Sequence, residues 1–288
     1  MITVLRLFGK KVVLELNEYP YSAEGSRLTR LPFVRPLLRQ FVFRAIFPIA
    51  PNFIVISKAL EHLVATRAPK AATLQVPILA EDRPVQVPWP DIDKNDIYIF
   101  HAGTLSEQKD GIYAVFKAFT RAHHELFERH SVRLKFLLTN NMTQPELWAR
   151  INELLVRNNV EDYVAVTGFC SDDELDQYLR GALALIVNKP KNLQNDHNFP
   201  TKLTKYLASG RPVILAAEKT EANRFLDDKV NAITVAPNDS TAISEALVHC
   251  FENPAAAREI GQAGSAVCEE RFFYARHAQR LSEFMHSL

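Results

Sequence analysis

Residues 101–111, His-Ala-Gly-Thr-Leu-Ser-Glu-Gln-Lys-Asp-Gly, connect an apolar run to a helical pattern. Gly103 directly follows the apolar run, and the helical pattern starts near Gly111. A strand-to-helix turn directs backbone N–H groups and the helix dipole at a place where an anion can bind, and Lys109 adds a positive charge. An ordinary loop with an exposed lysine would have the same sequence, so both interpretations stay open. The segment matches neither the G-x-G-x-x-G fingerprint nor the P-loop pattern.

A second polar segment, residues 192–202, lies between an apolar run and a helical pattern that starts at Pro200 and ends at Gly210. Open α/β sheets bind ligands at the carboxyl ends of their strands, facing helix N-termini. Lys202 and Lys205 fall in the first turn of this predicted helix, where the helix dipole disfavours cations by ~0.3–1 kcal/mol each. This conflict indicates a phosphate ligand, although two solvated lysines on a surface helix would give the same pattern.

Short apolar runs alternate with longer amphipathic stretches along the chain, which is typical of βαβ units around a parallel sheet. Strands are predicted at 11–16, 53–57, 72–76, 97–101, 132–138, 163–167, 183–187, 212–216 and 232–235. Helices are predicted at 111–130, 144–158, 172–181, 201–209, 220–226, 239–252 and 254–287, the last broken near Arg271. Ser171 and Glu174 have the spacing of a capping box at the start of the third helix. The predicted fold class is α/β.

The composition excludes several classes of protein. Among 288 residues, 34 Lys and Arg oppose 33 Asp and Glu, a balance that argues against a nucleic-acid-binding protein. Three scattered cysteines are too few for a disulfide framework or a zinc cluster, so a reducing cytoplasm fits best. The sequence has neither a signal-peptide layout nor an apolar run of about 20 residues that could span a membrane. We therefore expect a cytoplasmic globular protein.

Residues 27–47 form a basic and apolar segment with five arginines, no acidic residue and many Phe and Leu side chains. Such a segment suits a helix that lies in the interface of an anionic membrane, which would make the protein peripheral at the inner face of the membrane. Alternatively, its apolar face packs on the protein's own sheet while the arginines are solvated. Both interpretations stay open.

The segment 82–95 carries three prolines and three acidic residues and is predicted to be a linker. It divides the chain into a partial N-terminal Rossmann-like domain at 1–85 and a complete one at 86–270. The final segment, 271–288, is predicted to pack back on the N-terminal part.

The segment NFPTKLTKYLASGRPVI at 198–214 resembles the C-terminal motif of the group 1 (family 4) glycosyltransferases. Other segments, HAGTLSEQKDGI, TGFCSDDELDQYL, VVLELNEYP and FIVISKAL, are similar to further parts of the same family, in order along the chain. The resemblance implies a GT-B fold, in which two Rossmann-like domains face each other with a nucleotide-sugar in the cleft. It also implies transfer with retention to a saccharide or lipid-linked acceptor, in polysaccharide or glycoconjugate biosynthesis, without a metal or other cofactor.

The resemblance also implies a role for particular residues. Gly103 and Lys109 would face the donor diphosphate, and Lys205 would assist Lys109. Asn17 falls where many relatives have a histidine near the transferred sugar, so it completes the predicted catalytic set. The predicted donor-binding set further contains Thr104, Phe169 beside the base, His197, Asn198, Phe199 and Pro200 toward the sugar, and Lys202.

This sequence departs from the family at several positions. Relatives usually have two glutamates where His197 and Lys205 stand, and a lysine cannot accept hydrogen bonds from ribose hydroxyls. Relatives often have an arginine where Thr104 stands, and a longer N-terminal part. The chain is therefore expected to be either a short glycosyltransferase that keeps the donor-binding half, or a catalytically degenerate subunit that binds a partner or a nucleotide without turnover.

Overall fold

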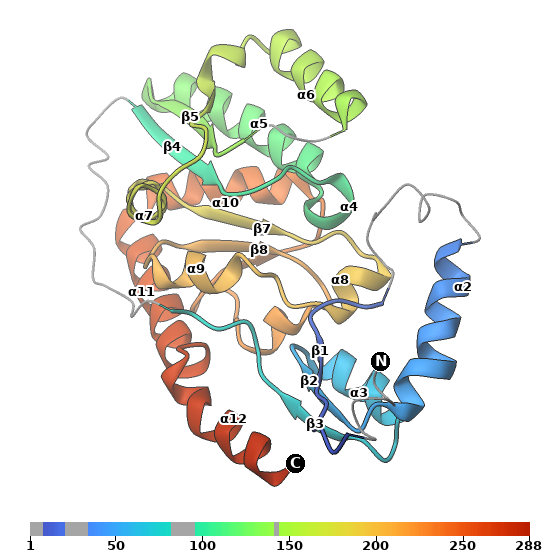
Figure 1. Cartoon of the computed structure of the whole chain (residues 1–288). Helices are drawn as coiled ribbons and strands as arrows, with labels where there is room; N and C mark the ends of the chain where they lie inside the picture. Colours follow the sequence, from blue (N-terminus) through green and yellow to red (C-terminus); the bar gives the residue numbers. More distant parts are fainter. Residues whose placement is uncertain (1–7, 21–33, 82–95, 141–143) are drawn as a thin grey trace.

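The computed structural model of the chain describes residues 8–20, 34–81, 96–140 and 144–288. Parallel strands form the sheets, and helices cover them, so the predicted α/β class is confirmed (Figure 1). The strands are β1 (Leu14–Leu16), β2 (Asn52–Val55), β3 (Ala72–Gln75), β4 (Asp96–His101), β5 (Arg133–Leu138), β6 (Val164–Val166), β7 (Leu185–Asn188), β8 (Val213–Ala216) and β9 (Ile233–Val235).

Most helices of the described residues connect these strands. They are α2 (Val34–Phe41), α3 (Lys58–Arg67), α4 (Glu107–Asp110), α5 (Ile112–His130), α6 (Pro145–Arg157), α7 (Asp172–Gly181), α8 (Leu193–His197), α9 (Leu203–Ala208), α10 (Ser240–Glu252), α11 (Pro254–Arg271) and α12 (Ala275–Ser287). A π-helical turn at Val42–Ile46 extends α2, and 3₁₀ turns follow at Phe47–Ile49, Glu161–Tyr163 and Glu221–Arg224.

The C-terminal half contains two three-stranded parallel sheets, β4-β5-β6 and β7-β8-β9. Strand β4 lies beside β7, where the Leu183 N–H donates to the Tyr98 carbonyl at 2.8 Å (Figure 1). The strand order across both sheets is therefore β6-β5-β4-β7-β8-β9. Successive strands are added outward from β4 on one side and outward from β7 on the other, so the order of the strands reverses between β4 and β7. In doubly wound sheets the crevice at this reversal, outside the carboxyl ends of the strands, is where ligands bind.

Alternation along β4 divides the core into two layers, because successive side chains of a strand point to opposite faces. Ile97 and Ile99 are buried among residues of α5 and α10, which pack against each other. Tyr98 and Phe100 lie on the opposite face beside α7, where the Phe100 ring stacks on Tyr178 at 5.1 Å between centroids. Packing on both faces fixes the position of β4, and its last residue, His101, lies in the crevice.

The N-terminal half is built on the parallel sheet β1-β2-β3, with α3 between β2 and β3. Phe53 and Val55 of β2 are fully buried under this helix. The first turn of α3 also contacts the C-terminal half, because the Lys58 N–H donates to the Glu221 carboxylate at 2.9 Å. The two halves are therefore joined by polar contacts as well as by the chain.

The C-terminal segment crosses back to the N-terminal half (Figure 1). Ala80 pairs with the turn between α11 and α12: its N–H donates to the Phe272 carbonyl at 2.7 Å, and its carbonyl accepts from Tyr274 at 3.1 Å. Arg280 of α12 donates to the Gln75 carbonyl at 3.4 Å. The domain boundaries at 85/86 and 270/271 stay predictions, and the predicted linker at 82–95 lies outside the described residues.

The helix boundaries differ from the sequence prediction in informative places. Helix α7 has the predicted bounds, and the predicted capping box of Ser171 and Glu174 is present. Helix α9 begins at Leu203 rather than at Pro200, because residues 200–202 form a turn in which the Leu203 N–H donates to the Pro200 carbonyl. Helix α3 is not predicted from the sequence. Only two of its ten residues are fully buried, so its apolar periodicity is weak.

Candidate active site

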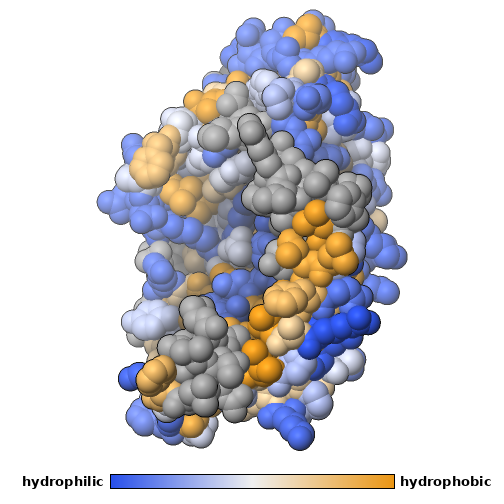
Figure 2. Space-filling model, turned by 45° about the vertical axis from the view of Figure 1, so that its right-hand side comes forward, coloured by the Kyte–Doolittle hydropathy of each residue, from blue (hydrophilic) through white to orange (hydrophobic). Residues whose placement is uncertain are grey.

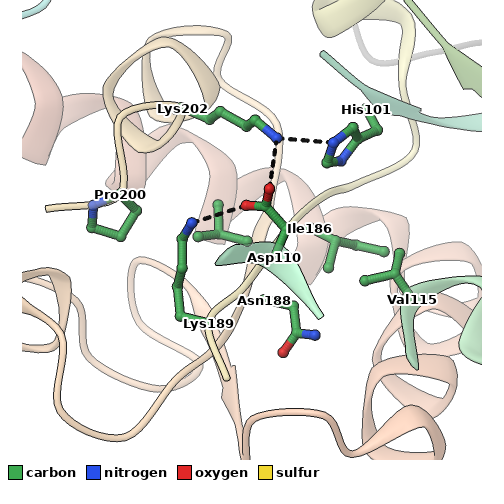
Figure 3. Close-up of a pocket in the computed structure, with 9 residues that line it drawn as sticks. His101, Asp110, Val115, Ile186, Asn188, Lys189, Pro200 and Lys202 are labelled. Atoms are coloured by element: carbon green, nitrogen blue, oxygen red, sulfur yellow. Dashed lines mark hydrogen bonds and ion pairs between the residues drawn. The ribbon is translucent and has the colours of Figure 1, made fainter. Parts of the chain in front are cut away.

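A buried cluster of charged side chains lies where β4 and β7 end (Figure 3). Lys202, in the turn before α9, places its ammonium 2.9 Å from His101 Nε2 and 3.6 Å from a carboxylate oxygen of Asp110. Lys189, directly after β7, contacts the other carboxylate oxygen of Asp110 at 2.9 Å. Two cations, one anion and one imidazole therefore converge on the crevice at the reversal of strand order.

Burial sets the protonation of this cluster. Desolvation, reinforced by Lys202, lowers the pKa of His101 to about 3, so the ring is neutral and accepts from the Lys202 ammonium. Desolvation also lowers the pKa of Lys202 to about 8, although Asp110 opposes the shift. Burial raises the pKa of Asp110, but Lys202 and Lys189 outweigh it, so the net shift is downward. Asp110 is a carboxylate at neutral pH, and Lys202 is a cation that is easily deprotonated.

Two glycines let the backbone approach these side chains closely. Gly111 has φ +49°, and a Cβ there would lie 2.4 Å from the Asn188 amide nitrogen and 2.1 Å from the Asn238 amide oxygen. Asn188 donates to the Gly111 carbonyl at 3.0 Å and so connects the end of β7 to the loop at residues 101–111. Gly103 has φ +94°, and a Cβ there would lie 3.6 Å from Lys202 Cε. Lys202 therefore lies directly beside the loop that follows β4.

Two cavities open beside the cluster. The larger, about 780 Å³, is lined by residues 104–110, by part of α6 and by Lys189, Thr201 and Lys202. The smaller, about 70 Å³, lies between the two halves of the chain and is lined by Asn17 and Glu18 after β1 and by residues of 189–201. Lys109 and Lys189 line both cavities, so the two cavities are neighbours.

Lys109 and Asn198 connect the two halves at this site. The Lys109 ammonium contacts the Glu18 carboxylate at 2.8 Å, and both side chains remain more than two-fifths exposed. Asn198 accepts from the Tyr19 N–H at 3.0 Å. The predicted residues Lys109, Asn17, Thr104, Asn198, Pro200 and Lys202 all line one of the two cavities.

Other predicted residues lie elsewhere. The Lys205 ammonium contacts Asp172 at 3.1 Å. The Phe169 side chain is fully exposed. The His197 ring packs on Tyr19 with 4.5 Å between ring centroids. Within the described ranges, these three residues line neither cavity. The Phe199 ring packs against Phe272 in the core at 5.2 Å between centroids, and Phe199 also lines the smaller cavity.

The short length of α9 changes the expected conflict between Lys205 and the helix dipole. Helix α9 has six residues, so Lys205 lies in its last turn as well as near its start. The dipole acts mainly within the first and last turns, and a cation in the last turn is favoured. The anion that contacts the Lys205 ammonium in this structure is the Asp172 carboxylate, at 3.1 Å.

The sequence analysis missed His101, Asp110, Lys189 and Gln194 as site residues. A usable signal existed for three of them, because His101 and Lys189 stand at the ends of apolar runs and Asp110 follows Lys109. Residues at the carboxyl ends of strands gather at one edge of a parallel sheet. Among the described residues, no group of three or more His, Cys, Asp or Glu side chains could hold a metal ion.

The sequence of the C-terminal half, which carries most of this site, matches a known protein family. The family described as glycosyl transferases group 1 matches residues 96–253, which is more than half of the chain. The chain belongs to the group 1 glycosyltransferases. Within this glycosyltransferase, the matched region contains His197 and Lys205, and the degenerate glutamate motif expected from the sequence stays a prediction.

Solved structures show the same GT-B fold. HepE from Anabaena, crystallised with UDP, has a TM-score of 0.73 at 18% identity, over 100% of this chain and 75% of that one. Sucrose-phosphate synthase from Thermosynechococcus elongatus has a TM-score of 0.72 at 19% identity, over 99% of this chain and 69% of that one. The pneumococcal O-GlcNAc transferase GtfA, in complex with UDP and GlcNAc, has a TM-score of 0.70 at 15% identity, over 96% of this chain and 52% of that one. Among curated protein sequences, none matches this glycosyltransferase.

Proposed function

We propose that this chain transfers a sugar from a nucleotide-sugar donor to a saccharide or lipid-linked acceptor, with retention of configuration, in polysaccharide or glycoconjugate biosynthesis. The observation that carries the proposal is the Lys202 ammonium beside the Gly103 loop, on the wall of the 780 Å³ cavity. A cation held there by Asp110 and His101 can move to a phosphate oxygen of a bound diphosphate. Because HepE and GtfA were crystallised with UDP, a UDP-sugar is the first donor to test.

In the proposed reaction, the bond between the anomeric carbon and the diphosphate oxygen breaks. The acceptor oxygen bonds to the same face of that carbon, and its proton passes to the leaving phosphate oxygen. Lys109 and Lys202 stabilise the charge that develops on the diphosphate, and no metal ion is required. Asn17 borders the sugar, together with the backbone of Asn198, Phe199 and Pro200. A contribution from Lys205 requires that its side chain leave Asp172.

An alternative is nucleotide binding without turnover. The ion pair between Lys109 and Glu18 favours it, because the ammonium that should face the diphosphate is already held by a carboxylate of the opposite half. Proton NMR of UDP-glucose, UDP-GlcNAc and GDP-mannose incubated with the protein and a saccharide acceptor separates the two functions. Loss of the donor's anomeric signal, with a product of the same anomeric configuration, supports the transferase. Nucleotide binding with all donors left intact supports the alternative.

We also propose that the chain acts at the cytoplasmic face of an anionic membrane through residues 27–47. Leu37 and Phe41 of α2 are 65% and 59% exposed. Figure 2 shows a band of apolar side chains on the side of the molecule that α2 occupies. The sequence from 34 to 50 contains three arginines and no acidic residue. Residues 27–33 lie outside the described part of the chain. Among the described residues, no helix is long and apolar enough to cross a membrane.

Both interpretations of this segment from the sequence have support. Phe43 and Phe47, which follow α2, are buried and pack on each other at 5.4 Å between ring centroids. The Arg39 guanidinium lies over the Tyr19 ring, 5.8 Å from its centroid. The inner face of the segment thus packs on the protein, and Leu37 and Phe41 remain for the membrane interface.

A further inference from the structure

The side chain of Gln194 in α8 lines the 70 Å³ cavity between the two halves. Gln194 is 3% exposed, and its Oε1 atom has no hydrogen-bond donor among the residues that the structure describes. A buried acceptor without a donor costs free energy, and native proteins rarely leave one unless a ligand or a water molecule supplies the donor. The cavity holds the volume of several water molecules, so a hydroxyl group can enter it.

The other residues around the cavity are mainly neutral hydrogen-bonding groups. Asn17, Asn195 and Asn198 supply amides, and Thr201 and Thr220 supply hydroxyls. Amides and hydroxyls can both donate and accept, which suits a polyhydroxylated ligand. Because the Asn195 amide nitrogen donates to the Pro190 carbonyl and the Asn198 amide oxygen accepts from Tyr19, a ligand would use the Asn195 oxygen and the Asn198 nitrogen.

The charged residues at the cavity already have partners. Lys109 contacts Glu18 at 2.8 Å, and Lys189 contacts Asp110 at 2.9 Å. Each of these two cations has a carboxylate partner, although Lys189 shares Asp110 with Lys202. The Glu18 carboxylate also lines the cavity and disfavours a second anion there, so the cavity suits a neutral group. This separates it from the side of the site where Lys202 borders the larger cavity.

Helix α8 holds Gln194 in a fixed position. The side chain of Asn192 caps the helix by accepting from the Asn195 N–H at 2.9 Å, and it donates to the Gln108 carbonyl at 2.9 Å. The Asn195 amide donates to the Pro190 carbonyl at 2.8 Å. A recognition residue is most selective when neighbouring hydrogen bonds fix its backbone in this way.

We infer that Gln194 is a specificity-determining residue that accepts a hydrogen bond from a hydroxyl of the transferred sugar. This inference rests on the proposed function, because the cavity borders the proposed diphosphate site. The nucleotide part of the donor binds without Gln194, and the sugar part adds affinity through it.

Calorimetric titration of UDP, UDP-glucose, UDP-GlcNAc, GDP and GDP-mannose into the parent, Gln194→Met and Gln262→Met tests this assignment. Met keeps the length of Gln and removes both polar atoms. Gln262 of α11 is the matched control, because it is exposed and lines neither cavity. We expect at least one nucleotide-sugar to bind the parent more tightly than its own nucleotide. Gln194→Met should reduce that gain about three- to tenfold, the scale of one hydrogen bond, and leave UDP and GDP unchanged.

Thermal unfolding provides the second readout. Because the Oε1 atom has no partner in the described structure, Gln194→Met should keep or raise the melting temperature. A lower melting temperature with an unchanged sugar gain would make Gln194 a structural residue and overturn the inference. So would a panel in which no nucleotide-sugar exceeds its nucleotide, or in which Gln194→Met keeps the full gain. Failure of UDP and GDP themselves to bind the parent would instead overturn the proposed function.

Discussion

The Lys202 ammonium donates a hydrogen bond to His101 Nε2 at 2.9 Å, where the His101 ring is buried and the Lys202 side chain is 24% exposed. The ring must be neutral to accept this bond, and the pKa of His101, lowered to about 3, keeps it so. Lys202, with a pKa lowered to about 8, loses its charge at a pH where an ordinary lysine keeps it. The positive charge that we assign to diphosphate binding is therefore sensitive to pH.

UDP binding should weaken as the pH rises through about 8. Below this pH, Lys202 is charged and the dissociation constant is constant; above it, the constant rises by up to tenfold per pH unit as the ammonium is lost. Calorimetry between pH 7.5 and pH 9.5 measures this, because the terminal phosphate of UDP, with a second pKa of about 6, is almost fully ionised over this range. In Lys202→Arg the dependence should disappear, because arginine stays protonated. An equal slope in both proteins would assign the dependence to another group.

His101 should make the folded protein sensitive to acid. Its pKa is lowered from 6.5 to about 3, so between these values the unfolded chain binds a proton that the folded chain does not. The free energy of unfolding should therefore be highest above pH 6.5 and decrease as the pH falls, by up to about 1.4 kcal/mol per pH unit from this group. Urea unfolding of the parent and His101→Gln at pH 7 and pH 5 checks it. The variant should lose less stability between the two pH values, and an identical loss would contradict the assignment.

The sequence predicted the C-terminal sheet better than the site. Strands β4, β7 and β8 are continuous apolar runs because both faces of each are buried, and such runs are recognised without knowledge of the fold. The register of the two sheets and the reversal between β4 and β7 depend on contacts between distant segments, which periodicity does not contain.

Asp110 and Lys189 illustrate what the sequence could not provide. They are separated by 79 residues and form an ion pair at 2.9 Å only because β4 and β7 lie side by side. Lys205 also has a partner that is distant in the sequence. Its place in the motif suggested a ligand, but the start of α7 supplies a carboxylate, Asp172, that no local pattern connects with it.

Glu221 should be a principal polar link between the two halves. Its carboxylate is 3% exposed and accepts from the Lys58 N–H at 2.9 Å, from the Gln75 amide at 2.7 Å and from Arg224 at 2.5 Å. Glu221→Ala leaves the first two donors unpaired and should lower the free energy of unfolding by roughly 2–4 kcal/mol. Urea unfolding measures the change.

Glu218→Ala is the matched control for Glu221→Ala. Glu218 is half exposed and contacts only the exposed Lys191 at 3.6 Å among the ion pairs of the described residues. An exposed pair of this kind contributes about 0–1 kcal/mol, so the control should stay close to the parent. Equal effects of the two substitutions would show that Glu221 does not link the halves.

The exposed face of α2 should bind anionic membranes. We expect the parent to sediment with vesicles of phosphatidylcholine and phosphatidylglycerol, less with phosphatidylcholine alone, and less at high salt. The double variant Leu37→Ser, Phe41→Ser removes two side chains that are 65% and 59% exposed and should reduce binding at least about tenfold. Phe127→Ser, Val156→Ser removes two apolar side chains that are 49% and 50% exposed elsewhere and should bind as the parent does. Binding that is equal in both double variants would exclude this surface.

Diphosphate binding through Lys202 is tested most directly by calorimetric titration of UDP into the parent, Lys202→Ala and Lys191→Ala at pH 7. Lys191 is the matched control, because it lies in the same connection between β7 and α9, before α8, but is 63% exposed. A hydrogen bond to a charged group is worth about 1.5–3 kcal/mol, so Lys202→Ala should weaken UDP binding roughly 10- to 100-fold, whereas Lys191→Ala should not change it. Equal affinity of the parent and Lys202→Ala, or no binding of millimolar UDP to the parent, would contradict the assignment of this cluster to the donor diphosphate.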